Sequence, residues 1–184
     1  MKALLGLPSA YSIEMEMPSG NMNSDLILFV KNVFFAILLP GTVTVLVPYL
    51  IVSDRRVGIQ WNAGCLLALV PLTVGIVVLL RCIWDFAVSG RGTLAPVDPP
   101  KNLVVRGFYR YVRNPMYFGV LLILSGETWL FRSQPLLLYI AAGFVAINGF
   151  VLLYEEPHLR RRFGDTYAQY CRTVPRWVPR WPRR

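Results

Sequence analysis

The uncharged stretch SQPLLLYIAAGFVAINGFVLLY, Ser133–Tyr154, decides the fold. It runs for 22 residues, and about 20 apolar residues are enough for a helix to cross the hydrocarbon core of a bilayer. Two further runs without a charge, Asn32–Ser53 and Val57–Leu80, are at least as long. A core helix of a soluble protein can imitate one such run. Three of them in 184 residues predict a membrane protein.

The composition agrees with this prediction, because 55% of the residues are hydrophobic and only 16% are charged. A fourth, shorter apolar run, Asn114–Phe131, carries Glu127 near its end. We therefore predict an all-α, polytopic membrane protein with about four transmembrane helices. Only residues 132–134 separate the last two helices, which should form a tight antiparallel hairpin.

The expected helices divide the chain into three parts. Residues 1–25 form an N-terminal lead. Residues 26–88 hold the first two transmembrane helices, expected at about Leu26–Val52 and Asn62–Phe86. Residues 89–184 form a functional region that contains the helical hairpin 116–154 and an Arg-rich tail, with a short helix expected at Glu156–Tyr170.

The net charge of +9 is concentrated in two segments. Arg81–Arg113 has six basic residues against two acids, and the chain after Tyr154 has eight arginines against three acids. With four helices both segments fall on one face, which the positive-inside rule assigns to the cytoplasm. The charge then reflects topology and lipid headgroup contact, and no nucleic-acid binding is expected. The spacing of Arg81 and Asp85 predicts an ion pair on one helix face.

Three polar clusters are expected at this cytoplasmic face. The first is Gly90-Arg91-Gly92, where missing side chains would let backbone amides approach a ligand closely. A simple flexible loop explains the same residues. The three cysteines show no metal-ligand spacing, so we read them as free thiols and expect no metal site.

The second cluster is Arg113-Asn114-Pro115-Met116-Tyr117. Pro115 suits the first turn of a helix, and Arg113 and Asn114 stand just before the free amides of that turn. These donors can bind a carboxylate or a phosphate. An interfacial anchor is the other interpretation, since Arg and Tyr also favour the headgroup level.

The third cluster is Glu155-Glu156, directly after the 22-residue run. Adjacent carboxylates at a membrane boundary need a cationic or hydrogen-bonding partner. A solvated helix end with Glu156 paired to Arg160 would meet that need. The hairpin, however, brings Tyr117 and Tyr154 to the same membrane face. Together the clusters then suit a zwitterionic ligand with a ribose and a positive centre.

The segments GRGT, GFYRYVRNPMYFG and YEEPHLRRRFGDTYAQYCRTVPRWVP resemble the isoprenylcysteine carboxyl methyltransferase and phospholipid methyltransferase superfamily of membrane enzymes. The resemblance covers roughly Ser89–Pro179. It implies that S-adenosylmethionine binds on the cytoplasmic side and that a lipid-linked acceptor enters from the bilayer. The implied cofactor-binding residues are Gly90, Gly92, Arg113, Asn114, Tyr117, Glu155 and Glu156. Tyr109, Tyr111 and Tyr117 could face the sulfonium by cation–π contact.

The acceptor stays open. Prenylcysteine methyltransferases often carry His at the position of Asn114, and their helix before the paired Glu contains Arg, whereas Asn148 is the only strongly polar residue here. Both a prenylcysteine carboxylate and a phospholipid amine remain as acceptors. No catalytic residue is assigned, because methyl transfer from a sulfonium needs mainly positioning. His158 should face solvent or the edge of the cofactor.

Two other functions remain as alternatives. Membrane sterol reductases, which use NADPH, share a related R-x-P-x-Y and V-P pattern, although paired Glu would repel that cofactor. A non-enzymatic membrane adaptor with a lipid-binding tail is the second. The tail residues Tyr167, Tyr170, Arg176 and Trp177 either cover the site or anchor at the interface, and the oligomeric state is not predicted.

Overall fold

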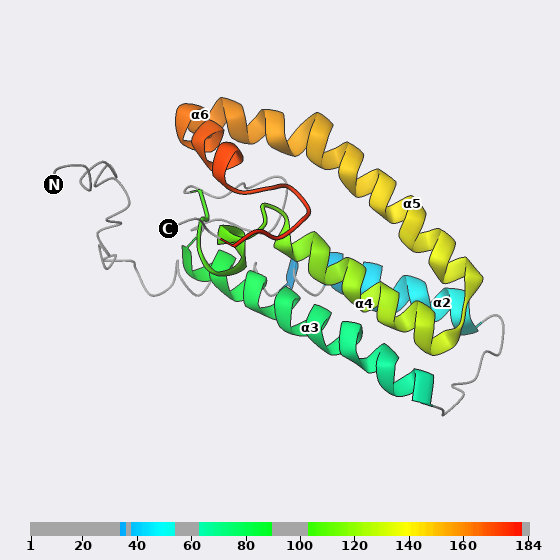
Figure 1. Cartoon of the computed structure of the whole chain (residues 1–184). Coiled ribbons are helices and arrows are strands. Elements are labelled where there is room, and N and C mark those ends of the chain that lie inside the picture. Colours follow the sequence, from blue (N-terminus) through cyan, green and yellow to red (C-terminus); the bar gives the residue numbers. More distant parts are fainter. Residues whose placement is uncertain (1–33, 36–37, 54–62, 90–102, 182–184) are drawn as a thin grey trace, which may run out of the picture.

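A computed structural model describes residues 34–35, 38–53, 63–89 and 103–181. These described residues form helices and connecting turns and contain no strand, which confirms the all-α class. The predicted lead 1–25 and the start of the first helix lie outside them. The elements are η2 (Thr42–Leu46), α2 (Val47–Ser53), α3 (Ala63–Ser89), η3 (Gly107–Arg110), α4 (Pro115–Phe131), α5 (Gln134–Phe150), η4 (Val151–Glu155) and α6 (Glu156–Thr173) (Figure 1).

Two of the helical stretches are long and apolar enough to cross a membrane. They are Gly64–Asp85 in α3 and the continuous helix Gln134–Thr173, which joins α5, η4 and α6. Leu38–Ser53 and Pro115–Phe131 are shorter apolar helices. Large apolar side chains on α3 and α5, among them Leu66, Leu138 and Val145, are exposed. Apolar surface of this extent is typical of a face that contacts lipid.

Helices α3 and α4 are packed backbone to backbone. A Cβ added to Gly75 would lie 2.7 Å from the carbonyl oxygen of Gly119, and one added to Gly126 would lie 2.9 Å from that of Ala68. Small residues permit such an approach, which is a common means of helix association in membranes. The buried core beside this contact contains Leu79, Val120, Ile123 and Leu124. The pair α3–α4 is therefore the rigid base of the molecule.

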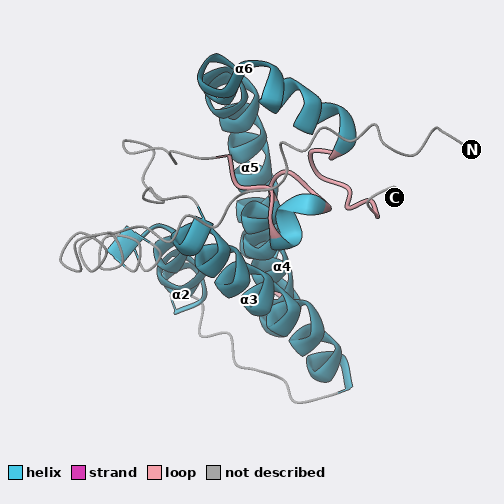
Figure 2. Ribbon diagram, turned by 90° about the vertical axis from the view of Figure 1, so that its left-hand side faces the viewer, coloured by secondary structure: helices cyan, strands magenta, loops and turns pink. Residues whose placement is uncertain are grey.

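The connection from α4 to α5 is as short as the sequence predicts. Arg132 adopts a left-handed conformation with φ 47°, and the Ser133 hydroxyl accepts a hydrogen bond from the Leu136 amide. From this turn, however, α5 diverges from α4 toward the end where α6 lies (Figures 1 and 2). A Cβ on Gly143 or Gly149 would meet nothing within 4 Å. The glycines of α4 thus pack against α3, whereas those of α5 take part in no close helix contact.

Helix α5 does not end at Tyr154, as the sequence suggested. It continues through the π-turn η4 into α6, and the helix bends only at Gly164, whose φ is 51° and ψ −126°. Beyond that bend the second half of α6 and residues 174–181 turn back toward the start of α4 (Figure 1). A residue with positive φ in mid-helix reverses the chain here, and glycine adopts this conformation most readily.

A buried carboxylate fixes η3 to the end of α3. Asp85 forms the predicted ion pair with Arg81, with Nε and Oδ2 3.3 Å apart, and a second with Arg106 at 4.0 Å. Gly107, with φ 55°, lies so close that a Cβ there would collide with the Asp85 carboxylate. Because η3 is held in this way, the chain enters α4 from a defined position.

Candidate functional site

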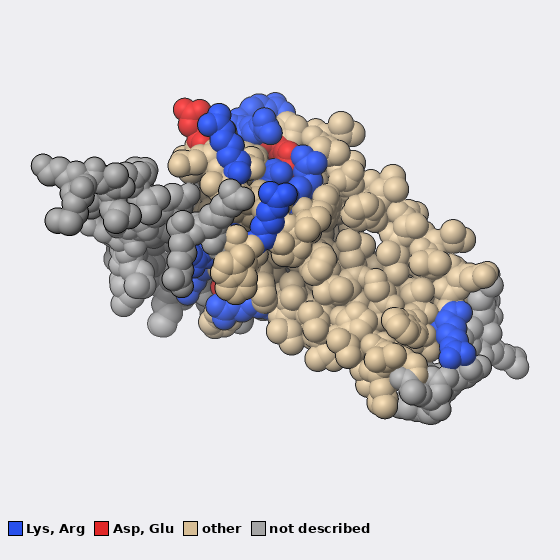
Figure 3. Space-filling model, viewed as in Figure 1, with Lys and Arg blue, Asp and Glu red and all other residues tan. Residues whose placement is uncertain are grey.

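The site lies where α4 begins. Pro115 occupies the first turn of α4 and is fully buried, as expected for a proline helix start. The backbone amide of Arg113 donates a 2.9 Å hydrogen bond to the carbonyl oxygen of Pro175. The corner before α4 is therefore held by the C-terminal part of the chain, more than 60 residues later. Charged side chains gather at this end of the molecule, over α6 (Figure 3).

Arg113 and Glu156 form a largely buried ion pair. Nη1 of Arg113 lies 2.8 Å from Oε1 of Glu156, and the two side chains are only 12% and 9% exposed. The same Nη1 lies 3.0 Å from Sγ of Cys171. Nε of Arg113 is buried and donates to no group in the described part of the chain. A buried donor without an acceptor is costly, so this guanidinium retains capacity for a further partner.

Arg176 binds the same carboxylate through two parallel contacts. Its Nε lies 2.7 Å from Oε1 of Glu156, and its Nη2 lies 2.9 Å from Oε2. Burial alone would raise the pKa of Glu156, but the hydrogen bonds from Arg176 and the charges of Arg113 and Arg176 outweigh it and hold that pKa below its usual value. The hydrogen bond to Glu156 in turn raises the pKa of Arg176. Arg160, the local partner considered from sequence, contributes only a weaker charge effect.

Glu155 has a different environment from its neighbour. The hydroxyl of Tyr117 donates a 3.1 Å hydrogen bond to Oε2 of Glu155. Within residues 103–181 this is the one hydrogen bond that the carboxylate receives, and no arginine there forms an ion pair with it. The predicted proximity of the second and third clusters is thus observed, with Tyr117 on Glu155 and Arg113 on Glu156. Of the two carboxylates, Glu155 has more unused hydrogen-bonding capacity.

Residues Val174–Trp181, the C-terminal strap, cross the start of α4 and reach α5. Nδ2 of Asn114 donates to the carbonyl oxygen of Arg176 at 3.3 Å, and the amide of Arg180 donates to that of Tyr111 at 3.0 Å. On the other side, Nε1 of Trp177 donates to Oδ1 of Asn148 at 3.0 Å. The strap therefore joins α4 to α5 where the two helices have diverged. Arg176 and Trp177 belong to a cover over the site, which was one of the two interpretations left open.

The tyrosines before α4 separate into two groups. Burial raises the pKa of Tyr109 well above its usual value, and the nearby Cys82 and Glu155 raise it further, so this phenol stays protonated. The carbonyl oxygen of Tyr109 accepts a 2.7 Å hydrogen bond from the Tyr170 hydroxyl, while Tyr117 donates to Glu155. Tyr111 instead packs on Trp181, with ring centroids 5.4 Å apart. Tyr111 therefore belongs to the wall of packed aromatic side chains beside the strap, whereas Tyr117 contacts Glu155.

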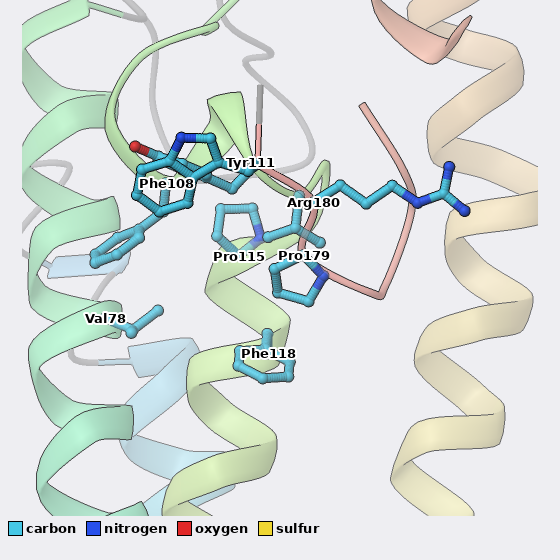
Figure 4. A pocket seen from close by; sticks show the side chains of 9 residues that line it. Val78, Phe108, Tyr111, Pro115, Phe118, Pro179 and Arg180 are labelled. Atoms are coloured by element: carbon cyan, nitrogen blue, oxygen red, sulfur yellow. The ribbon is translucent and has the colours of Figure 1, made fainter. Parts of the chain in front are cut away.

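A cavity of about 440 Å³ lies between α3, α4 and the strap. Its walls are almost entirely apolar, and the Arg180 side chain extends away from it (Figure 4). Neither Glu155 nor Glu156 lines it; they belong to the helix that continues from α5, and they contact Tyr117 and Arg113 at the start of α4. The lining residues are Val78, Phe108, Tyr111, Val112, Pro115, Phe118, Pro179, Arg180 and Trp181.

The remaining predicted residues have the following positions. Gly90 and Gly92 lie outside the described residues. His158 stacks on Tyr154 with ring centroids 6.0 Å apart and is partly buried, so it lies beside the cluster and not within it. In the described ranges no group of His, Cys, Asp and Glu is arranged to hold a metal ion.

Three site contacts were not predicted from the sequence: Arg176 with Glu156, Cys171 with Arg113, and Trp177 with Asn148. Each joins residues separated by 20 to 58 positions, so no local spacing rule reports it. One signal was available, namely Gly164 inside the polar helix, which permits the chain reversal that brings the strap back.

Comparison with known proteins gives a consistent set of matches. The family described as phospholipid methyltransferase matches residues 63–166. A protein-S-isoprenylcysteine O-methyltransferase of Schizosaccharomyces pombe is 34% identical over 87 residues, covering 42% of this chain and 33% of that protein. Protein-S-isoprenylcysteine O-methyltransferase B of Arabidopsis thaliana is 36% identical over 80 residues, covering 42% of this chain and 40% of that protein.

An uncharacterized protein of Haemophilus influenzae is 35% identical over 63 residues, which is 34% of this chain and all of that protein. The chain thus spans only about a third to two fifths of the length of the two named relatives. No solved structure matches significantly.

Proposed function

Because this chain belongs to the phospholipid methyltransferase family, we propose that it transfers a methyl group from S-adenosylmethionine to a lipid-like acceptor in the membrane. One observation carries the proposal. At the end of long apolar helices, Arg113 lies beside a carboxylate pair, and its Nε has no acceptor among the described residues. The first carboxylate, Glu155, receives within residues 103–181 a hydrogen bond from one group, the Tyr117 phenol. This combination of donors and acceptors suits a ligand that carries both charges.

The proposed cofactor-binding residues are Gly90, Gly92, Arg113, Asn114, Tyr117, Glu155 and Glu156. Arg113 and the free amides at the start of α4 suit the carboxylate of the cofactor. Glu155 suits its amino group or its ribose hydroxyls. The faces of Tyr109 and Tyr117 suit the sulfonium, since aromatic rings attract cations most strongly where water is excluded.

The sulfonium of the bound cofactor supplies an activated methyl group. The protein then has to hold the acceptor atom in line with the methyl carbon and the sulfur, and such positioning can supply a large part of the rate. As the carbon–sulfur bond breaks, a bond forms to a carboxylate oxygen or an amine nitrogen, and a neutral thioether is released. A carboxylate acceptor needs no base, whereas an amine must lose its proton before attack.

The proposed topology has four membrane crossings, with α4 and the helix containing Leu38–Ser53 as the shorter two. The site and the C-terminus then lie on the cytoplasmic side, where the positive-inside rule places the basic segments. In this arrangement the opening between α4 and α5 faces the acyl chains of the bilayer. A prenylcysteine carboxylate and a phospholipid amine are both proposed as acceptors, because no arginine of α5 selects a carboxylate.

Calorimetry on the detergent-purified protein tests the cofactor. We expect S-adenosylmethionine and its demethylated product to bind, and Arg113→Ala and Glu155→Ala to weaken binding at least about tenfold, since charge-assisted hydrogen bonds are worth about 1.5–3 kcal/mol. Arg172→Ala, which removes an exposed arginine of α6, is the control and should bind as the wild type does. Absence of binding to the wild-type protein, or displacement by NADPH, would overturn the proposal.

Labelled S-adenosylmethionine, supplied with a panel of prenylcysteine and phospholipid acceptors, tests the reaction. Label transferred to one class of lipid identifies the acceptor. A protein that binds the cofactor but methylates none of these lipids would contradict the proposed acceptor class and leave the cofactor assignment standing.

A further inference from the structure

We infer that Arg176 of the C-terminal strap is a positioning residue for this site, which acts through Glu156 on Arg113, and that Glu155 alone of the two glutamates contacts the ligand. The inference rests on the proposed function and changes one of its assignments: Glu156, included there among the cofactor-binding residues, supports binding through Arg113 and does not itself touch the ligand.

The hydrogen-bonding capacity of Glu156 is nearly exhausted by protein groups. Its Oε1 receives both Arg113 Nη1 and Arg176 Nε, and its Oε2 receives Arg176 Nη2. The residue is 6% exposed, and two guanidinium charges surround its single negative charge. A cationic ligand group approaching Glu156 would therefore meet net positive charge. A parallel pair of N–H donors, as Arg176 supplies here, also fixes the orientation of the carboxylate.

Arg113 is held in place by that carboxylate. Nη1 is used for Glu156 and Cys171, and its direction is set by the position of Oε1. Nε remains a buried donor that no described residue satisfies. The Glu156 carboxylate thus orients the Arg113 guanidinium, and Arg176 in turn orients the Glu156 carboxylate. Without Arg176 one of the two cations that neutralise Glu156 is lost, and the carboxylate can rotate about its side-chain torsions.

Glu155 takes no part in the contacts that join Arg176, Glu156 and Arg113. Its carboxylate is bonded to Tyr117 and forms no ion pair with an arginine among residues 103–181. A ligand amine or ribose hydroxyl can therefore bind it without displacing a protein cation. The strap itself is held independently of Glu156, by Pro175 on the Arg113 amide and Trp177 on Asn148. Loss of Arg176 should therefore disturb the site without unfolding the protein.

A double-mutant cycle tests this division, with calorimetric binding of S-adenosylhomocysteine to the full chain in detergent. We expect Arg176→Ala and Glu156→Gln each to weaken binding about tenfold, and the double variant to be no weaker than either one, because the residues act as a unit. Arg176→Ala and Glu155→Gln should instead be additive. Arg176→Lys should restore part of the affinity, and the exposed control Arg172→Ala should leave it unchanged.

A kinetic readout separates positioning from a general structural defect. In Arg176→Ala the KM for the cofactor should rise about tenfold, while kcat at saturating cofactor stays within about threefold of wild type, because the lost contact affects cofactor binding and not the transferred methyl group. Wild-type affinity in Arg176→Ala, or additivity with Glu156→Gln, would overturn the inference.

Hydrogen exchange without any cofactor keeps this test distinct from that of the proposed function. Amides at the start of α4 should exchange faster in Arg176→Ala and Glu156→Gln than in the wild type, with Arg172→Ala unchanged. Unchanged exchange in both variants would overturn the link through Glu156. If the wild type bound no S-adenosylhomocysteine, the proposed function would fail, while faster exchange would still support the action of Arg176 on Arg113.

Discussion

Tyr117 and Glu155 are joined by a 3.1 Å hydrogen bond across the opening between α4 and α5. Tyr117 belongs to the first turn of α4, whereas Glu155 ends the π-turn that follows α5. The contact therefore spans two helices that have diverged from their common turn. It sets the position of the carboxylate to which we assign the ligand contact.

Tyr117→Phe should weaken binding of S-adenosylhomocysteine by about tenfold, because a hydrogen bond to a charged group contributes about 1.5 kcal/mol. Calorimetry in detergent measures the effect. Tyr139→Phe is a matched control, since it removes a hydroxyl that donates to the Val43 carbonyl oxygen elsewhere in the helical bundle. Equal losses of affinity in the two variants would contradict a specific role for Tyr117.

Trp177→Phe should destabilise the strap. The change removes the indole N–H that satisfies Asn148, and an unsatisfied amide in an apolar helix costs about 1–3 kcal/mol. We expect a lower thermal midpoint and faster hydrogen exchange in residues 174–181. Trp181→Phe, at a side chain that is 82% exposed, should leave both unchanged. A wild-type thermal midpoint in Trp177→Phe would show that the hydrogen bond from Trp177 to Asn148 does not contribute to stability.

Gly75→Ala should lower the stability of the bundle by about 1–3 kcal/mol, because the new methyl group would lie 2.7 Å from the Gly119 carbonyl oxygen and force α3 from α4. Gly143→Ala is the control, with nothing within 4 Å of its Cβ. Helix propensity alone should make that variant neutral or more stable by up to about 1 kcal/mol. Thermal unfolding in one detergent compares them, and an equal midpoint would refute close packing of α3 on α4.

Gly107→Ala and Gly164→Ala separate steric collision from backbone strain. Both positions have positive φ, 55° and 51°, so both variants carry a strain of about 1–3 kcal/mol. Only Gly107 also lies against the Asp85 carboxylate. Its variant should therefore be the less stable of the two by thermal unfolding. The reverse order would mean that Asp85 does not fix η3 to α3.

The ion pairs of Glu156 should be lost in acid. Its folded-state pKa lies below its usual value, so its contribution to stability is fully present above the unfolded pKa of about 4.3. That contribution disappears as the pH falls through the lowered folded-state value. Thermal midpoints measured from pH 6 to pH 3 should decline less steeply in Glu156→Gln than in the wild type. Parallel profiles would exclude this carboxylate as the titrating group.

Sequence reasoning predicted what depends on local spacing. Uncharged runs give α3, α4 and α5, Pro115 marks the start of α4, and the four-residue spacing of Arg81 and Asp85 gives their ion pair. These features follow from helix geometry alone.

Long-range features could not be obtained in this way. Helices α3 and α4 pack closely at the glycines 75, 119 and 126, whereas Gly143 and Gly149 of α5 have no neighbour within 4 Å of an added Cβ. All five glycines look alike in the sequence, so it does not indicate which of them lie in a helix contact. The ion-pair partner of Glu156 could not be predicted from local spacing either. Arg160 satisfies the local spacing rule, but Arg176 forms the contact because the chain reverses at Gly164.

The unbroken helix from Gln134 through η4 has a consequence for depth in the bilayer. At about 1.5 Å per residue, Glu155 lies roughly 30 Å along the axis from the α4–α5 turn, which equals the hydrocarbon thickness of a typical membrane. In the proposed topology the length of α5 and η4 therefore sets the Glu155 carboxylate at the depth of the lipid headgroups. One residue inserted into α5 would move Glu155 by about 1.5 Å and turn it by about 100° around the helix axis. The length of this apolar segment is thus as much a determinant of the site as the identity of its polar residues.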